Sequence, residues 1–151
     1  MLAQSERGDV HLLRQLVHGD FWDNNVLFHR GRVVLVADLD FMGKRPRIDD
    51  LALVLYYTNS TFRDDPLSDD RMRKLRDLVD AYDSGLADHL TSAERAALPL
   101  ALARTPLCFV GMIASVDTEA GAKRLAAEIG WDVTWALAIV RDLGRWREAF
   151  S

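Results

Sequence analysis

Two short apolar runs in the first third of the chain predict a β-hairpin. The runs cover residues 26–28 and 33–37 and are rich in β-branched side chains, which favour strands. Between them lies the polar segment 29–32, which contains a glycine, as hairpin turns usually do. Apolar residues are also frequent over 9–17, where the pattern fits either the end of a short helix or a brief strand.

Beyond the hairpin, the apolar positions recur at helical intervals. Asp49 and Asp50 suit a helix N-terminus, where their charge meets unpaired N–H groups and the positive end of the helix dipole. Ser68 is the expected start of a second helix. Thr91 and Glu94 have the spacing of a capping box and open a third helical stretch.

Prolines and tryptophans mark the end of this helical region. Pro99 and Pro106 are expected to kink or divide the third stretch, and residues 118–128 and 132–149 read as two closing helices. The last helix carries a row of large apolar residues at intervals of three and four: Trp131, Trp135, Ile139, Leu143 and Trp146. A stripe that faces the core is favoured over a surface that stacks on a cofactor.

The predicted fold class is therefore α+β and mostly helical, with one hairpin followed by a helical body in a single domain over 1–151. Of the 151 residues, 49% are hydrophobic and 28% charged, which is typical of a globular domain. The formal net charge of −4 gives no basic surface of the kind that nucleic acid attracts. No nucleic-acid partner is expected.

The sequence also favours a cytoplasmic protein without a membrane span. Its one cysteine, Cys108, cannot form an internal disulfide, and the N-terminus lacks the apolar core of a signal peptide. The longest apolar run, over 100–116, is interrupted by Arg104 and Pro106 and is short for a bilayer.

Polar side chains crowd the two ends of the predicted hairpin. Asn25 comes directly before the first strand and Asp38 directly after the second, so an antiparallel hairpin brings them to the same end. Asp20 precedes Asn25 by five residues on the same loop. Amide and carboxylate oxygens without a His or Cys pair favour Mg²⁺ over zinc. The alternative is a solvated turn rich in Asp and Asn, which by itself explains Asp23 and Asn24.

Three segments in order resemble a kinase active site. The motif HGDFWDNN, residues 18–25, places an aspartate, four residues and an asparagine as in the catalytic loop of protein kinases, and ADLDF follows the hairpin. With glycine after His18, the pattern resembles the aminoglycoside phosphotransferase family, which includes choline kinases and a type of homoserine kinase. The segment RPRIDDLALVLYY strengthens the match, because the family tends to carry Pro-x-x-x-Asp-Leu-Ala there.

This resemblance implies roles for individual residues. Asp20 would be the catalytic base, and Asn25 and Asp38 would bind Mg²⁺ and, through it, ATP. Asp40 would touch a second metal ion. Supporting roles are implied for the neighbouring residues: His18 orients the loop, Asp50 anchors its helix to the loop, and Trp22 and Asp23 face the acceptor.

The implied fold is the C-terminal catalytic lobe of a kinase-like protein. Only seventeen residues precede His18, too few for the N-terminal nucleotide-binding lobe, so that lobe is expected to be absent. Self-association through the face it would cover is therefore expected. The implied activity is ATP- and Mg²⁺-dependent phosphorylation of a small-molecule hydroxyl on an aminoglycoside, homoserine or an amino alcohol. The alternatives are a noncatalytic module that binds a partner or metal, and a metal-dependent hydrolase.

Overall fold

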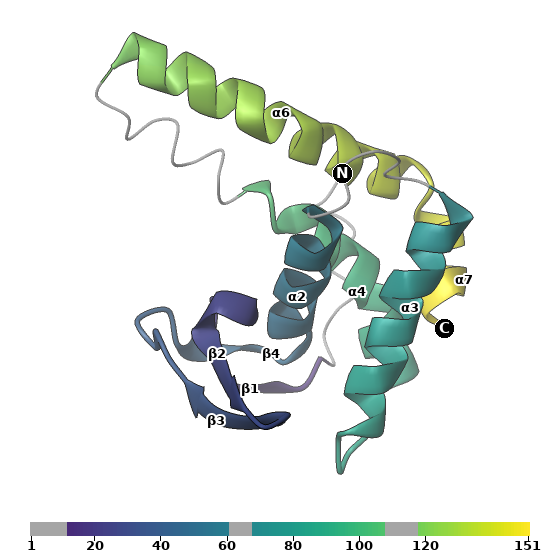
Figure 1. Ribbon diagram of the computed structural model, residues 1–151. Helices are drawn as coiled ribbons and strands as arrows, with labels where there is room; N and C mark the ends of the chain where they lie inside the picture. The colour runs from purple at the N-terminus through teal and green to yellow at the C-terminus, as the bar shows by residue number, and fades with distance from the viewer. Residues whose placement is uncertain (1–11, 61–67, 108–117) are drawn as a thin grey trace.

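Four short strands lie beside a group of helices in the computed structural model, which describes residues 12–60, 68–107 and 118–151 (Figure 1). The strands are β1 (Arg14–Val17), β2 (Val26–His29), β3 (Arg32–Val36) and β4 (Gly43–Pro46), with a 3-10 turn, η2 (Asp23–Asn25), before β2. The helices are α2 (Ile48–Ser60), α3 (Asp69–Ser84), α4 (Ser92–Arg104), α6 (Glu119–Arg141) and α7 (Leu143–Phe150). The predicted α+β, mostly helical character is confirmed.

Strands β2 and β3 form the predicted hairpin. They pair antiparallel from Val26 opposite Val36 to His29 opposite Arg32, with an irregularity after Leu27. The two residues of the turn, Arg30 and Gly31, both have positive φ, at 49° and 74°. Positive φ at both central positions is the geometry of a type I′ turn, whose twist matches that of the flanking strands.

A second strand pair, which the sequence did not predict, holds the base of this hairpin. Strand β1 pairs antiparallel with β4, so that Val17 lies opposite Gly43. Residues 9–17 therefore end in a strand rather than a helix. Strand β4 has the sequence GKRP, whose polar side chains and terminal proline carry no strand pattern. Its conformation comes from the long-range pairing with β1.

The core lies within the helices, around α4. This helix packs against α2, α6 and α7, while α3 packs against α2 and α7. Residues 97–103 of α4 are all buried, as expected of a helix that neighbours surround. Trp135, Ile139 and Trp146 are fully buried in the same core, so the predicted core-facing stripe is confirmed.

The prolines act as expected at only one of the two positions. Helix α4 continues through Pro99 and ends at Arg104, shortly before Pro106, so Pro106 and not Pro99 marks a division of the third stretch. The apolar packing around α4 offsets the cost of a proline inside a helix, about 3 kcal/mol for the lost backbone hydrogen bond and the ring clash together. The closing helices also do not separate near Gly130: α6 runs unbroken to Arg141, and the break comes at Asp142. A single helical glycine costs only about 1 kcal/mol and need not end a helix.

The expected helix starts are confirmed. Ser68 caps α3 by accepting a hydrogen bond from the Arg71 N–H, and Thr91 and Glu94 form the reciprocal bonds of a capping box at α4. Cys108 lies outside the described residues. No helix within the described residues is long and apolar enough to cross a membrane.

Candidate active site

The segment between β1 and β2 is held against the start of α2 by a single carboxylate. Asp50, in the first turn of α2, accepts hydrogen bonds from the backbone N–H groups of His18 and Gly19, each at 2.8 Å and each on a different oxygen. Aspartate is common in the first turn of a helix because it lies in the positive field of the helix dipole. Here it also joins the helix to the loop that contains Asp20.

Position 19 of the loop accepts only glycine. Its φ is +83°, and a Cβ there would lie 2.3 Å from the carbonyl oxygen of Phe41. The loop thus passes in close contact with the segment that follows β3, which brings the two polar segments of the sequence together.

His18 links the loop to the end of β3 through its ring. Its Nε2 lies 2.8 Å from the carbonyl oxygen of Ala37, and its Nδ1 accepts a hydrogen bond from the Asp20 N–H at 3.3 Å. A carbonyl can only accept and an amide N–H can only donate, so these contacts correspond to the neutral ring with its proton on Nε2. Both ring nitrogens are occupied in orienting the loop.

Asn25 contacts Asp20 directly. The Asn25 side chain is buried, and its Nδ2 donates to the Asp20 backbone oxygen at 2.8 Å and to the Asp20 carboxylate at 3.1 Å. Two acceptors at Nδ2 fix the orientation of the amide, so Oδ1 is the atom of Asn25 that can bind a cation.

Asp38 comes directly after Ala37, which is hydrogen-bonded to the loop at Asn25 and His18. The Ala37 N–H donates to the Asn25 backbone oxygen at 2.9 Å, and the Ala37 carbonyl is the partner of His18. Asp38 itself has φ +58°, a left-handed conformation that is uncommon outside glycine and is often found at functional sites. The side chains of Asp38 and Asp40 are exposed.

A cavity of about 830 Å³ opens beside Asp20. Residues of the loop, of α2 and of the C-terminal part of α4 line it. The charged lining residues are Asp20, Arg45, Asp49 and Arg104, and Tyr57, Leu53 and Ala101 are among the uncharged ones. A volume of this size suits a small-molecule ligand.

The remaining predicted contact residues lie at the edge of this arrangement. Trp22 stacks on Tyr57 with ring centroids 4.8 Å apart, and Tyr57 lines the cavity. Asp23 is exposed in η2. Trp22 therefore shapes the cavity through Tyr57, while Asp23 faces solvent.

Sequence reasoning missed three charged residues of the cavity lining, Arg45, Asp49 and Arg104. Asp49 was assigned only to the helix start, and Arg45 and Arg104 were given no role. One signal was present: Asp49, Leu53 and Tyr57 recur at intervals of four and therefore share one face of α2. Nothing in the sequence indicated that Arg104 of α4 would line the same cavity as these residues of α2.

The electrostatics of Asp49 reflect both burial and these arginines. Burial raises the pKa of the Asp49 carboxyl, while Arg104 and Arg45 oppose the shift without cancelling it. Arg104 Nη2 lies 3.0 Å from Asp49 Oδ1. Asp49 is thus a partly desolvated carboxylate with two guanidinium groups close by.

The residues at the hairpin end fit a hard divalent cation. The donors there would be the Asn25 amide oxygen and the carboxylates of Asp38 and Asp40, all oxygen atoms, and Mg²⁺ binds through few carboxylates while keeping several waters. Within the described residues, no three His, Cys, Asp or Glu side chains form a metal-binding group. An exposed pair of carboxylates plus an amide is compatible with a cation that arrives with its phosphate ligand.

Comparison with protein families decides the affiliation of the chain. Residues 3–87, more than half of the sequence, match the phosphotransferase enzyme family, APH. The chain belongs to this family. The match contains the complete loop, hairpin and α2 described above, and membership indicates a phosphotransferase of the kinase type. No match was found to a curated protein or to a solved structure.

Proposed function

We propose that this phosphotransferase transfers the γ-phosphate of ATP to a hydroxyl group of a small molecule, as the catalytic lobe of a kinase-like protein. The observation that carries the proposal is the position of Asp20, which is bonded to Asn25 and also lines a cavity large enough for an acceptor. In this reaction the acceptor oxygen attacks the γ-phosphorus, its proton passes to the Asp20 carboxylate, and ADP leaves.

Asn25 and Asp38 would hold Mg²⁺, with Asp40 at a second ion. The bound cation would neutralise the negative charge of the phosphates, which is its usual contribution to phosphoryl transfer. The contribution of this chain is to keep Asp20 and Asn25 at fixed positions through His18 and Asp50.

The test is a transfer assay with ATP and Mg²⁺ over a set of hydroxylated acceptors. Asp20→Asn should lower the rate about 10²–10⁴-fold, the usual contribution of a positioned base. The matched control, Asp77→Asn, removes an exposed carboxylate on α3 and should leave the rate unchanged. An equal rate for Asp20→Asn and the control would reject Asp20 as the base.

Calorimetric titration with ATP, combined with product analysis from the transfer assay, distinguishes a kinase from a noncatalytic module and from a hydrolase. Binding that needs Mg²⁺ and is lost in Asp38→Asn supports Asp38 as a metal ligand. ATP binding without a phosphorylated product would favour a noncatalytic module. Released phosphate without a phosphorylated acceptor would favour a hydrolase.

A further inference from the structure

Among the described residues, Arg45 is a cation of the cavity lining that forms no ion pair with a carboxylate. Asp49 lies in the field of Arg45 but is bonded to Arg104, at 3.0 Å. The Arg45 Nη2 donates to the carbonyl oxygen of Phe41 at 3.0 Å, and its side chain makes no second hydrogen bond within the described parts of the chain. A guanidinium has five N–H donors, so most of those of Arg45 are available to a ligand in the cavity.

The Arg45 guanidinium lies beside the contact between the two polar segments of the site. The Phe41 carbonyl that accepts its hydrogen bond is also the group against which Gly19 packs. Gly19 directly precedes Asp20, which lines the same cavity as Arg45. Phe41 in turn belongs to the segment that begins at Asp38. Arg45 therefore folds back toward the place where the catalytic base and the metal-binding segment meet.

The reaction requires positive charge at this place. Asp20, Asp38 and Asp40 all carry carboxylates, and the phosphoryl group that passes from donor to acceptor is itself negatively charged. A cation held at a fixed position against that group stabilises the charge of the transition state without reorganisation. A guanidinium suits this task because its planar fork can donate to two phosphoryl oxygens at once.

We propose that Arg45 is a catalytic residue that binds the phosphoryl group during its transfer. The inference rests on the proposed function, because it places the transferred group between Asp20 and a cation held by Asn25 and Asp38. The Arg45 guanidinium donates to oxygens of that group, while its bond to the Phe41 carbonyl anchors it. It stays protonated throughout: a bond forms between the acceptor oxygen and phosphorus, the bond to ADP breaks, and the acceptor proton passes to Asp20.

Lys44 provides a matched control on the same strand. Successive side chains of a strand point to opposite faces, and Lys44 is exposed and is not among the described residues that line the cavity. Lys44→Gln and Arg45→Gln remove the same amount of charge from neighbouring positions. A difference between the two variants therefore reports the position of the charge and not the net charge of the chain.

The first measurement is calorimetric titration of the full chain with Mg²⁺ and inorganic tripolyphosphate, which presents the phosphate groups of the donor without the nucleoside. At constant ionic strength, Arg45→Gln should weaken this binding about 10–100-fold, because a charge-assisted hydrogen bond to phosphate is lost. Lys44→Gln should leave it unchanged. Equal affinities of the two variants would overturn the proposal. Absence of Mg²⁺-dependent binding to the unmodified chain would do the same, independently of the folding of any variant.

The second measurement is the transfer rate with ATP, Mg²⁺ and an acceptor. Arg45→Gln should lower kcat about 10³-fold, the lower end of the contribution of an arginine on a transferred phosphoryl group, and leave the acceptor KM unchanged. A raised acceptor KM with unchanged kcat would place Arg45 on the acceptor and overturn the proposal. Arg45→Lys keeps the charge but lacks the fork that reaches both Phe41 and a phosphoryl oxygen, so it should restore only part of the rate.

The outcome is separable from that of the proposed function. Weakened tripolyphosphate binding in Arg45→Gln, without any phosphorylated product from the unmodified chain, would leave Arg45 as a phosphate-binding residue and remove the kinase. A transfer rate that falls in Asp20→Asn but is equal in Arg45→Gln and Lys44→Gln would leave the kinase standing and remove Arg45 from the reaction.

Discussion

The helical body and the hairpin formed by β2 and β3 are stabilised in different ways. In the body, the side chains of Leu98, Leu102 and Ile139 have no exposed surface, and they belong to one continuous core. On the hairpin, Phe28 is 64% and Val34 61% exposed. Burial, the largest favourable contribution to folding, therefore belongs mainly to the body.

The loop beside the hairpin depends on individual hydrogen bonds instead. Asp50, His18 and Asn25 bond the loop that contains Asp20 to α2, to the end of β3 and to itself. Such bonds fix geometry but each contributes only about 1 kcal/mol, or up to about 3 kcal/mol for a charged partner. The position of Asp20 can therefore be lost while the body remains folded. Self-association through the face that the N-terminal lobe would cover stays a prediction that light scattering can test.

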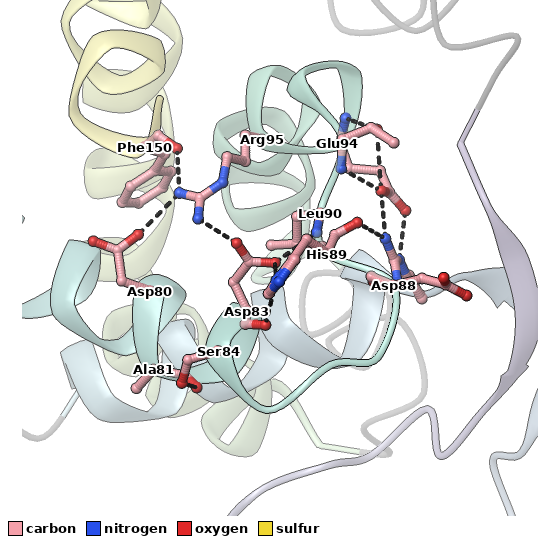
Figure 2. Close-up of polar contacts among 12 residues, drawn as sticks. Asp80, Ala81, Asp83, Ser84, Asp88, His89, Leu90, Glu94, Arg95 and Phe150 are labelled. Carbon is pink, nitrogen blue, oxygen red and sulfur yellow. Dashed lines mark hydrogen bonds and ion pairs between the residues drawn. The ribbon is translucent and has the colours of Figure 1, made fainter.

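The largest effect is expected from breaking the buried ion pair of the body. Glu94 is 1% exposed and accepts two hydrogen bonds from Arg47, at 2.7 and 2.8 Å. Glu94→Gln leaves the buried guanidinium without a counter-charge, which should lower the free energy of unfolding by about 3–5 kcal/mol. Urea denaturation measures the change. Figure 2 shows Glu94 next to a second polar cluster, in which Arg95 joins Asp80, Asp83 and the backbone of Phe150.

Two further measurements test whether burial is what makes the Arg47–Glu94 pair important: the loss of an exposed ion pair, and stability as a function of pH. Arg73→Gln breaks an exposed pair with Asp70 and should change stability by no more than about 0.5 kcal/mol. Burial alone would raise the pKa of Glu94, but hydrogen bonds from Arg47 and Thr91 outweigh it and lower the pKa. The ionised Glu94 therefore stabilises the folded state fully above the ordinary carboxyl pKa. This contribution is lost as the pH falls through the lowered pKa of the folded state. Stability should fall less steeply in acid for Glu94→Gln than for the unmodified chain.

The next largest effect is expected at Gly19 in the loop, for which Gly31 in the hairpin turn is a matched control. Gly19 and Gly31 both have positive φ, but a Cβ at Gly31 meets nothing within 4 Å. Gly31→Ala should cost only the backbone strain, about 1–2 kcal/mol. Gly19→Ala adds the clash with Phe41, for a total of about 2–4 kcal/mol, and moves Asp20. Phosphoryl transfer should therefore fall sharply in Gly19→Ala alone; equal rates in the two variants would contradict the close contact.

A smaller effect on stability is expected at the link between the two regions. Asp50→Asn replaces one of two acceptor oxygens by an NH₂ group that faces a backbone N–H, which should cost about 1–3 kcal/mol. The core does not depend on this bond, so the loss of activity should exceed the loss of stability. Thermal unfolding and the transfer rate, measured on the same sample, compare the two; a rate that falls only in proportion to the folded fraction would show that the bond does not position the loop.

The sequence correctly predicted the elements that depend on residues close to one another along the chain. The hairpin and the capping box at Thr91 depend on residues within a few positions of one another, and both were predicted correctly. Strand β4 was missed because it forms only through pairing with β1, from which it is separated by 26 positions at the Val17–Gly43 end of the register and by 32 at the Arg14–Pro46 end. The role of Arg104 was missed for the same reason, since its partner Asp49 is brought close by helix packing.

The continuity of α6 is the clearest local miss, and it leads to the smallest predicted effect. The prediction placed a helix end between residues 128 and 132, yet the stack of Trp131 on Trp135, with ring centroids 6.2 Å apart, continues the helical face through this segment. A Cβ at Gly130 meets nothing within 4 Å. Gly130→Ala should therefore raise the free energy of unfolding by about 0.5–1 kcal/mol through helix propensity alone. Transfer activity should not change, because α6 contributes no residue to the described cavity. Destabilisation would show instead that the helix needs the freedom of glycine at this point.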